Sequence, residues 1–313
     1  MFVGVDVGSR WLDVALGPEG EVLRVANPAG IPDLLQRLPS GAVVGLEGTG
    51  TYYRPLAYAL YRAGFHVVVL NPFAVKSYSR SLLRRAKTDR ADARLIARFV
   101  AERWQQLPPY YPSEDSLVLL GVLVRLWDSL TSDYVGMLNR LHAWEYVVPG
   151  LADLLRDIPA GVEGLRRRVL REALQVVGSD DLLSSWVESL MSLPGIGQVL
   201  AIRILAYSGD LRRFRSARAY AAFTGLTPRI VQSGVMPQSS RISRFGPPGL
   251  RGAYYMAAVA AYRSSSLHRS FVEALMARGK PKKVALVALA NRLARAAWVV
   301  CVKGGLDKGE VNV

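Results

Sequence analysis

The sequence predicts an α/β domain at its amino-terminal end and a mainly helical region after it. Apolar runs of strand length occupy residues 2–9, 42–47 and 66–72, and a glycine or proline stands at the end of each. An apolar pattern of helical spacing, residues 53–64, lies between the second and third runs. Strand, helix, strand in this order is typical of a layered α/β domain. From residue 117 onward, longer apolar patterns have helical spacing.

Asp6 is an acid within the first predicted strand, in the run FVGVDVGS. A buried ionised carboxylate costs several kcal/mol unless a partner compensates it. We therefore expect a metal ion, a hydrogen-bond network or an exposed strand end at this position. The alternative is an aspartate that caps the turn after the strand through Ser9.

Glu47 ends the second predicted strand, in the run AVVGLEGTGTYY, where Gly48 and Gly50 open a turn. Acids at the ends of adjacent strands can converge on one edge of a sheet. Taken alone, Glu47 is also explained as an acid near a helix N-terminus, where it answers the helix dipole.

Asp89 and Asp92 lie at the start of a predicted helix, KTDRADARLIARFV, residues 87–100. Their spacing of three residues places both on one face of the helix. Taken alone, Asp89 as N-cap and Asp92 as a first-turn acid explain the pair well. The conjunction with Asp6 and Glu47 instead favours one carboxylate pocket.

These segments resemble, motif by motif, the DEDD-type insertion-sequence transposases related to the Piv invertase, a family of bridge-RNA-guided recombinases. The resemblance covers about the first hundred residues. It rests on the four stretches VGVDVGSRWLDVAL, LEGTGTYYRPLAYAL, LNPFAVKSYSRS and KTDRADARLIA.

The resemblance implies an RNase H-like, RuvC-type fold whose acidic tetrad corresponds to Asp6, Glu47, Asp89 and Asp92. It also implies Mg²⁺ or Mn²⁺ as the ion, and a hard cation suits carboxylate oxygens and open positions for phosphate. His66, His142 and His268 are scattered along the sequence and are interpreted as surface or packing residues.

The composition predicts a polyanionic partner. Lysine and arginine number 40 against 25 acids, which gives a net charge of +15 and a pI of about 10.2. Such residues neutralise phosphates and release counterions. A solvated basic face or an acidic membrane surface are the alternatives. The basic residues before and within the last acidic motif are candidate nucleic-acid contacts: Lys76, Arg80, Arg84, Arg85 and Lys87.

Four segments are expected: a RuvC-like domain 1–108, a helical or coiled-coil region 109–185, a serine transposase domain 186–305 and a tail 306–313. The proline-rich stretch 105–116 marks the first boundary. The middle region contains amphipathic patterns at 117–147 and 164–177, which predict an antiparallel helix pair or a subunit contact. We expect no signal peptide, because the sequence enters a predicted strand directly without a basic region followed by a short apolar one. We also expect no membrane contact, because the apolar stretch 284–302 is interrupted by polar residues and is interpreted as a buried helix.

Residues 190–214 contain the turn LPGIG and resemble a helix-hairpin-helix element. Gly195 and Gly197 would let backbone amides approach a DNA phosphate at the start of the next helix. An ordinary turn between two helices, without a ligand, is the alternative.

Residues 217–263 resemble the transposase domain of the same family, and the resemblance places the nucleophilic serine at Ser233. Ser239, Ser240 and Ser243 are rivals by spacing alone. The family's Lys-x-Gly-Asn pattern is replaced here by Arg244, Phe245, Gly246 and Pro247. The basic residues expected to contact nucleic acid in this region are Arg229, Arg241, Arg244, Arg251, Lys282 and Lys283.

The sequence thus predicts a site-specific DNA recombinase of an insertion sequence that uses a serine-linked intermediate and metal-bound acids. The resemblance adds a bridge RNA, donor and target double-stranded DNA, a dimer to tetramer, and a prokaryotic cytoplasm at the nucleoid. Three alternatives remain: a RuvC-like nuclease without a covalent intermediate, an actin-like or sugar-kinase ATPase, and a non-catalytic binder of branched DNA. The ATPase needs a second glycine-rich phosphate loop, which the sequence lacks.

Overall fold

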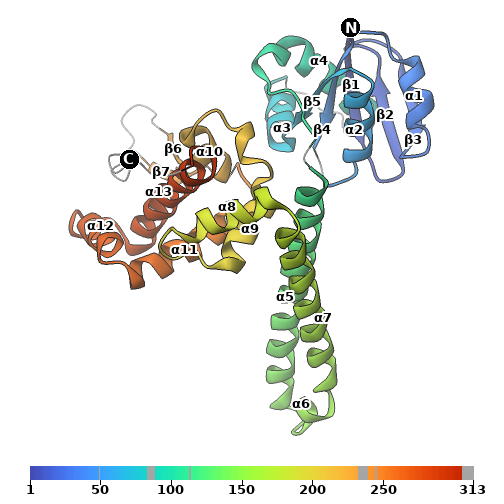
Figure 1. Cartoon of the computed structure of the whole chain (residues 1–313). Helices are drawn as coiled ribbons and strands as arrows, with labels where there is room; N and C mark the ends of the chain where they lie inside the picture. Colours follow the sequence, from blue (N-terminus) through green and yellow to red (C-terminus); the bar gives the residue numbers. More distant parts are fainter. Residues whose placement is uncertain (49, 83–88, 113, 232–238, 244, 305–313) are drawn as a thin grey trace. The chain divides into compact units, whose positions relative to one another are not determined.

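The computed structural model describes residues 1–48, 50–82, 89–112, 114–231, 239–243 and 245–304. The chain forms two compact units, Met1–Pro112 and Ser113–Val313. The boundary between them in the sequence falls within the proline-rich stretch 105–116. The first unit is a mixed α/β layer structure, and the second is mostly helical (Figure 1).

The first unit contains a five-stranded sheet of order β3-β2-β1-β4-β5. Strands β1, β2 and β3 pair antiparallel, whereas β1, β4 and β5 pair parallel. Its strands are β1 Phe2–Val7, β2 Trp11–Ala15, β3 Val22–Ala26, β4 Val43–Glu47 and β5 His66–Leu70. Its helices are α1 Ile31–Arg37, α2 Arg54–Arg62, α3 Pro72–Ser81, α4 Asp89–Arg103 and the short η1 Trp104–Gln106.

Helices cover both faces of this sheet. Alternate residues of β1, including Val3 and Val5, pack with Leu34 of α1 and Leu56 of α2 on one face. Leu95, Ile96, Phe99 and Val100 of α4 pack on the other face with α3. The sheet is therefore the middle of three layers, and one of its faces belongs to α4.

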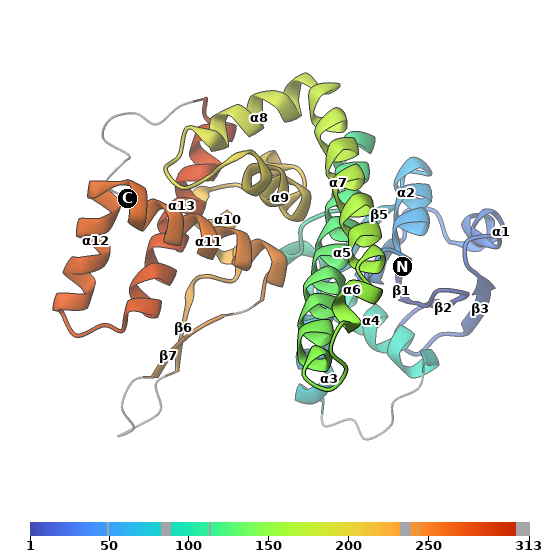
Figure 2. The same cartoon turned by 90° about the horizontal axis from the view of Figure 1, so that it is seen from below.

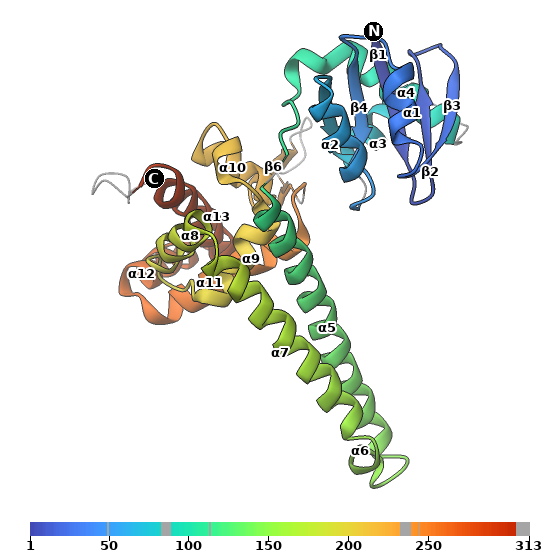
Figure 3. The ribbon, with the colours of Figure 1, turned by 45° about the vertical axis from the view of Figure 1, so that its right-hand side comes forward.

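The second unit begins with a helical hairpin. Helices α5 Asp115–Glu145 and α7 Asp157–Gly178 run side by side, joined at the far end by α6 Leu151–Leu154 (Figure 3). This is the antiparallel helix pair that the amphipathic patterns predict. The remaining elements are α8 Asp181–Met191, α9 Gln198–Ser208, η2 Leu211–Arg213, α10 Ala217–Thr224, β6 Pro228–Val231, β7 Ser239–Ile242, α11 Pro248–Ser264, α12 Ser266–Ala277 and α13 Lys282–Val302.

Helix α13 is the central helix of the second unit. By length and composition alone it could span a membrane, but 56% of its most apolar stretch is buried against the protein. It contacts α8, α10, α11 and α12, and alanines of α11 and α13 allow close helix packing. The interpretation of this stretch as a buried helix fits that packing.

Two short antiparallel strands, β6 and β7, extend from the helices of the second unit as a ribbon (Figure 2). The mainly helical prediction for this region did not include them. Strands of four residues are too short to give a clear alternating pattern in the sequence.

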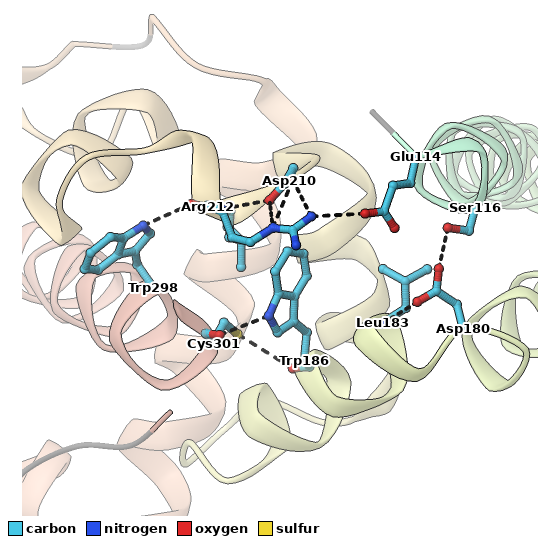
Figure 4. Close-up of polar contacts among 10 residues, drawn as sticks. Glu114, Ser116, Asp180, Leu183, Trp186, Asp210, Arg212, Trp298 and Cys301 are labelled. Atoms are coloured by element: carbon cyan, nitrogen blue, oxygen red, sulfur yellow. Dashed lines mark hydrogen bonds and ion pairs between the residues drawn. The ribbon is translucent and has the colours of Figure 1, made fainter. Parts of the chain in front are cut away.

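Side chains also tie the start of α5 to the rest of the second unit (Figure 4). Ser116 donates a hydrogen bond of 2.5 Å to Asp180, which caps α8. Arg212 pairs with Asp210 at 2.8 Å and with Glu114 at 3.1 Å. The indole of Trp298 donates to the carbonyl of Leu211.

Candidate acidic active site

Asp6 and Glu47 lie at neighbouring strand ends on the α4 face of the sheet. β1 and β4 pair in parallel with Val5 beside Leu46, so the next residues along each strand are Asp6 and Glu47. Both acids follow, two positions on, a glycine of their own strand. Because side chains alternate along a strand, each acid shares a face with that glycine.

The two glycines let α4 lie directly on the strands that carry the acids. A Cβ at Gly4 would stand 2.2 Å from the carbonyl oxygen of Ala93 in α4, and one at Gly45 would stand 2.3 Å from Val100. These distances are far below any real contact, so only glycine fits. The pattern Gly-x-Asp in β1 and Gly-x-Glu in β4 thereby sets the distance from the sheet to α4.

Asp89 and Asp92 occupy the first turn of α4. The positive end of the helix dipole favours acids there. Asp92 is half-buried, whereas the side chain of Asp89 is 70% exposed. The first-turn interpretation is therefore compatible with a shared site, because the carbonyl of Ala93, the residue after Asp92, lies beside Gly4 of β1.

The carboxyl of Asp6 experiences all the other acids of the tetrad. Burial, and then the negative charges of Glu47, Asp92, Asp89 and Asp13, together raise the pKa of Asp6 to about 6. The three segments thus bring their acids into one electrostatic environment, and a carboxyl pKa raised this way is characteristic of functional sites.

Within the described ranges, no three His, Cys, Asp or Glu side chains are gathered closely enough to hold a metal ion. The tetrad acids share a field without forming a ligand shell in this conformation. Their oxygens are nevertheless the donors that a hard divalent cation prefers, and burial and the neighbouring acids both disfavour the charged form of Asp6.

Sequence reasoning missed a fifth acid and an arginine beside the tetrad. Asp6, Asp13 and Arg24 are direct neighbours across β1, β2 and β3. Arg24 makes a bidentate pair with Asp13, at 3.0 and 2.8 Å, and also reaches Asp89 at 3.3 Å. Asp13 is only 4% exposed, and its place inside the apolar run WLDVAL was the available signal that it needs a partner.

Only some of the basic residues predicted to contact nucleic acid in the first unit lie within the part of the chain that the structure describes. Lys76 and Arg80 lie on α3 with exposed side chains. Arg84, Arg85 and Lys87 lie outside the described residues. The histidines make packing contacts, with His66 edge-on to Trp104 and His142 edge-on to Tyr146.

Ser233 and Arg244 lie outside the described residues. Arg229 and Arg241 are paired positions of the β6–β7 ribbon, and Ser239 and Ser240 are in β7. Ser243 follows the ribbon, and its buried hydroxyl has no hydrogen-bond partner among the described atoms.

Two further positions of the predicted basic set, Arg251 and Lys282, have structural partners. Arg251 donates to the carbonyl of Gly246. A Cβ at Gly246 would stand 1.9 Å from the carbonyl oxygen of Phe223, so packing requires this glycine. Nζ of Lys282 lies 4.9 Å from the ring centre of Tyr262, and both Lys282 and Lys283 are exposed.

The LPGIG turn joins α8 to α9, as expected. Gly195 has a φ of +84°, and a Cβ there would stand 2.2 Å from the carbonyl oxygen of Ala257 in α11. Packing against α11 therefore explains Gly195 by itself. Gly197 is exposed at the start of α9, with open space around it.

Comparison with protein families matches both units. The model of the DEDD transposases of IS110 type matches residues 3–144, and the model "Transposase IS116/IS110/IS902 family" matches residues 187–273. The first match contains all four tetrad acids. The chain belongs to the IS110-type DEDD transposases. It is therefore a DNA transposase or recombinase, and enzymes with a DEDD domain generally depend on a metal.

Relatives of known name support this membership along most of the chain. The pilin gene-inverting protein of Moraxella bovis is 29% identical over 82% of this transposase and 78% of its own length. A probable family 20 transposase of Pseudomonas aeruginosa is 26% identical over 88% of each chain. The transposase for insertion sequence element IS1328 of Yersinia enterocolitica is 26% identical over 84% of each chain.

Proposed function

We propose that this transposase is a site-specific recombinase that cuts and rejoins DNA through a serine-linked phosphodiester, with a divalent cation held by Asp6, Glu47, Asp89 and Asp92. The observation that carries the proposal is the raised pKa of Asp6, which burial and then the charges of acids from two other segments produce. An α/β sheet with acids at parallel strand ends is compatible with an RNase H-like, RuvC-type domain.

A cation bound by the tetrad, Mg²⁺ or Mn²⁺, would stabilise negative charge on the oxygens of a reacting phosphate. Asp6 and Glu47 would approach it from the sheet, and Asp89 and Asp92 from α4. Arg24 would keep Asp13 paired and, through its hydrogen bond to Asp89, would fix the position of that carboxylate.

The nucleophile in this proposal is Ser233. Its oxygen attacks phosphorus, a phosphorus–oxygen bond to one sugar breaks, and the released sugar oxygen takes up the proton that the hydroxyl loses. The protein–phosphate ester conserves the bond energy, so attack by another sugar hydroxyl rejoins a strand and frees the serine. Arg229, Arg241 and Arg244 belong to the same stretch and would neutralise the phosphate.

A guide RNA would supply sequence choice by base pairing, leaving the protein to hold backbones through its charge of +15. Exchange between donor and target duplexes requires several active sites, so we propose a dimer or tetramer. The substrate places the protein at the nucleoid of a prokaryotic cell.

Trapping the covalent intermediate tests this proposal. A labelled DNA substrate carrying the element's junction is incubated with the protein, Mg²⁺ and the co-purified RNA, then denatured and run on a gel. We expect a protein–DNA adduct with the wild-type protein, none with Ser233→Ala, and an adduct with the matched control Ser239→Ala.

The outcomes separate the rival activities. Cleavage without an adduct in the wild-type protein, unchanged in Ser233→Ala, would indicate a metal-dependent nuclease instead. An adduct that persists in Asp6→Asn would contradict the role of the tetrad. Branched-DNA binding with no cleavage at all would indicate a binding protein.

A further inference from the structure

A basic pocket lies in the second unit, and none of its lining residues is proposed above for catalysis. It has a volume of about 360 Å³ and is formed by the end of the α8–α9 turn, the start of α10 and one side of α13. Apolar side chains, among them Leu193, Leu293 and Val299, line one part of it. A pocket of this size accommodates a nucleotide-sized ligand.

Five cationic side chains line the pocket: Arg215, Arg218, Arg292, Arg295 and Lys303. No acid is among its described lining residues. Crowded like charges repel one another, and an anion placed among them reduces that repulsion. The pocket therefore favours a negatively charged ligand.

Arg212, which precedes the pocket arginines in the sequence, has a structural role and is paired with acids. Arg212 is paired with Asp210 and Glu114 and lies over the ring of Trp186 (Figure 4). Three and six residues later, Arg215 and Arg218 are exposed and contact no carboxylate in the described part of the chain. Nε of Arg295 is buried and has no hydrogen-bond partner among the described atoms.

The positive charge in the pocket also affects the pKa of His268. Burial, and then the charge of Arg292, lower the pKa of this histidine. The start of α10 adds the positive end of a helix dipole beside Arg215 and Arg218. Both effects have the sign that favours an anion.

A second hollow adjoins the pocket and points to an extended ligand. It surrounds the LPGIG turn, has a volume of about 420 Å³, and shares Leu193 and Pro194 with the basic pocket. A free mononucleotide would fill only one of the two. A nucleic-acid strand crossing Pro194 would place a phosphate among the arginines and its next unit over the exposed start of α9.

We propose that the pocket between α10 and α13 holds a phosphate of a single nucleic-acid strand, with the attached nucleoside against the apolar wall of Leu293 and Val299. The lining residues of this pocket differ from the residues proposed for catalysis. It rests on the proposed function in that the strand belongs to the DNA or the RNA of the recombination complex.

The test uses the full-length protein and fluorescence anisotropy with labelled 20-nucleotide single-stranded DNA, single-stranded RNA of the same sequence, and duplex DNA. The variant is Arg215→Gln/Arg218→Gln, and both side chains are exposed, so folding should be preserved. The matched control is Arg168→Gln/Arg171→Gln, an equal charge change at two exposed arginines of α7.

We expect the pocket variant to bind one single strand at least tenfold more weakly than the control does, and the strand affected identifies DNA or RNA as the source. The salt dependence of that binding should fall by about 0.7 in log–log slope for each lost phosphate contact. Arg215→Lys/Arg218→Lys, which keeps the charge, should stay within about threefold of wild type.

Equal weakening in the pocket variant and the control, or weakening for duplex DNA alone, would overturn the proposal. The proposal would also be overturned if the pocket variant changed only the binding of a free mononucleotide, added as competitor, and left strand binding unchanged. If the wild-type protein forms the serine adduct while the pocket variant binds like the control, only the pocket proposal fails. If the wild-type protein binds no nucleic acid, the proposed function fails with it.

Discussion

Replacing Asp6 by asparagine removes one charge from the acid cluster at nearly constant shape. The pKa of Asp6 is raised from 3.8 to about 6, by burial and then by Glu47, Asp92 and Asp89. The folded protein therefore binds this proton more tightly than the unfolded chain does. Wild-type stability should fall as the pH rises from about 4 to about 6, and the loss should persist above pH 6.

The size of this effect follows from the shift. One pKa unit corresponds to about 1.4 kcal/mol, so a fully buried carboxyl would lose about 3 kcal/mol. Because Asp6 is only half-buried and partly screened by solvent, we expect about 1–2 kcal/mol. Asp6→Asn should be more stable than wild type by that amount at pH 8 without metal, and close to wild type at pH 4.

The assay is urea unfolding of the full-length chain in EDTA at pH 4, 5, 6 and 8, followed by hydrogen-exchange mass spectrometry of peptides from β1 and β4. These peptides report on the first unit alone, so unfolding of the second unit does not interfere. A matched control is Asp33→Asn, an acid of α1 on the opposite face of the sheet. An Asp6→Asn variant that is destabilised equally at pH 4 and pH 8 would refute the shared negative field.

Three further changes test the surroundings of the site. Arg24→Gln should lower the urea midpoint of the first unit more than Arg24→Lys does, because buried Asp13 loses its bidentate partner; equal midpoints would contradict this role. Gly4→Ala should cost at least about 1–3 kcal/mol by pushing α4 from the sheet, whereas Gly41→Ala, with open space around it, should cost only its backbone strain. Tyr220→Phe should cost about 1–3 kcal/mol in the second unit, since its buried hydroxyl joins Ser208 and Tyr254 at 2.7 and 2.8 Å; unchanged unfolding would argue against that network.

The sequence was most informative where one segment carries its own signal. The apolar strands ending near Asp6 and Glu47 and the helix start at Asp89 follow from local periodicity and capping chemistry. Their convergence at Asp6 needed the parallel pairing of β1 with β4, which strand–helix–strand order makes natural.

Features that depend on contacts between distant segments were not predictable in the same way. The Arg24 pair with Asp13 depends on antiparallel register across β1, β2 and β3, and β3 itself is a short run interrupted by that arginine. Gly195 was interpreted from phosphate chemistry, but its neighbour is the backbone of α11, more than sixty residues later in the chain. The arginines of the α10–α13 pocket come from two helices whose contact no local pattern reveals.

The central claim is that carboxylates from three separate segments hold one catalytic divalent cation. Crystals of the full-length protein soaked in Mn²⁺ and measured at an energy where manganese scatters anomalously test it most directly. The account predicts an anomalous peak within bonding distance of Asp6 and of at least one acid from Glu47, Asp89 or Asp92, lost in Asp6→Asn crystals. Manganese bound only elsewhere, or no peak beside Asp6 at saturating Mn²⁺, would contradict it.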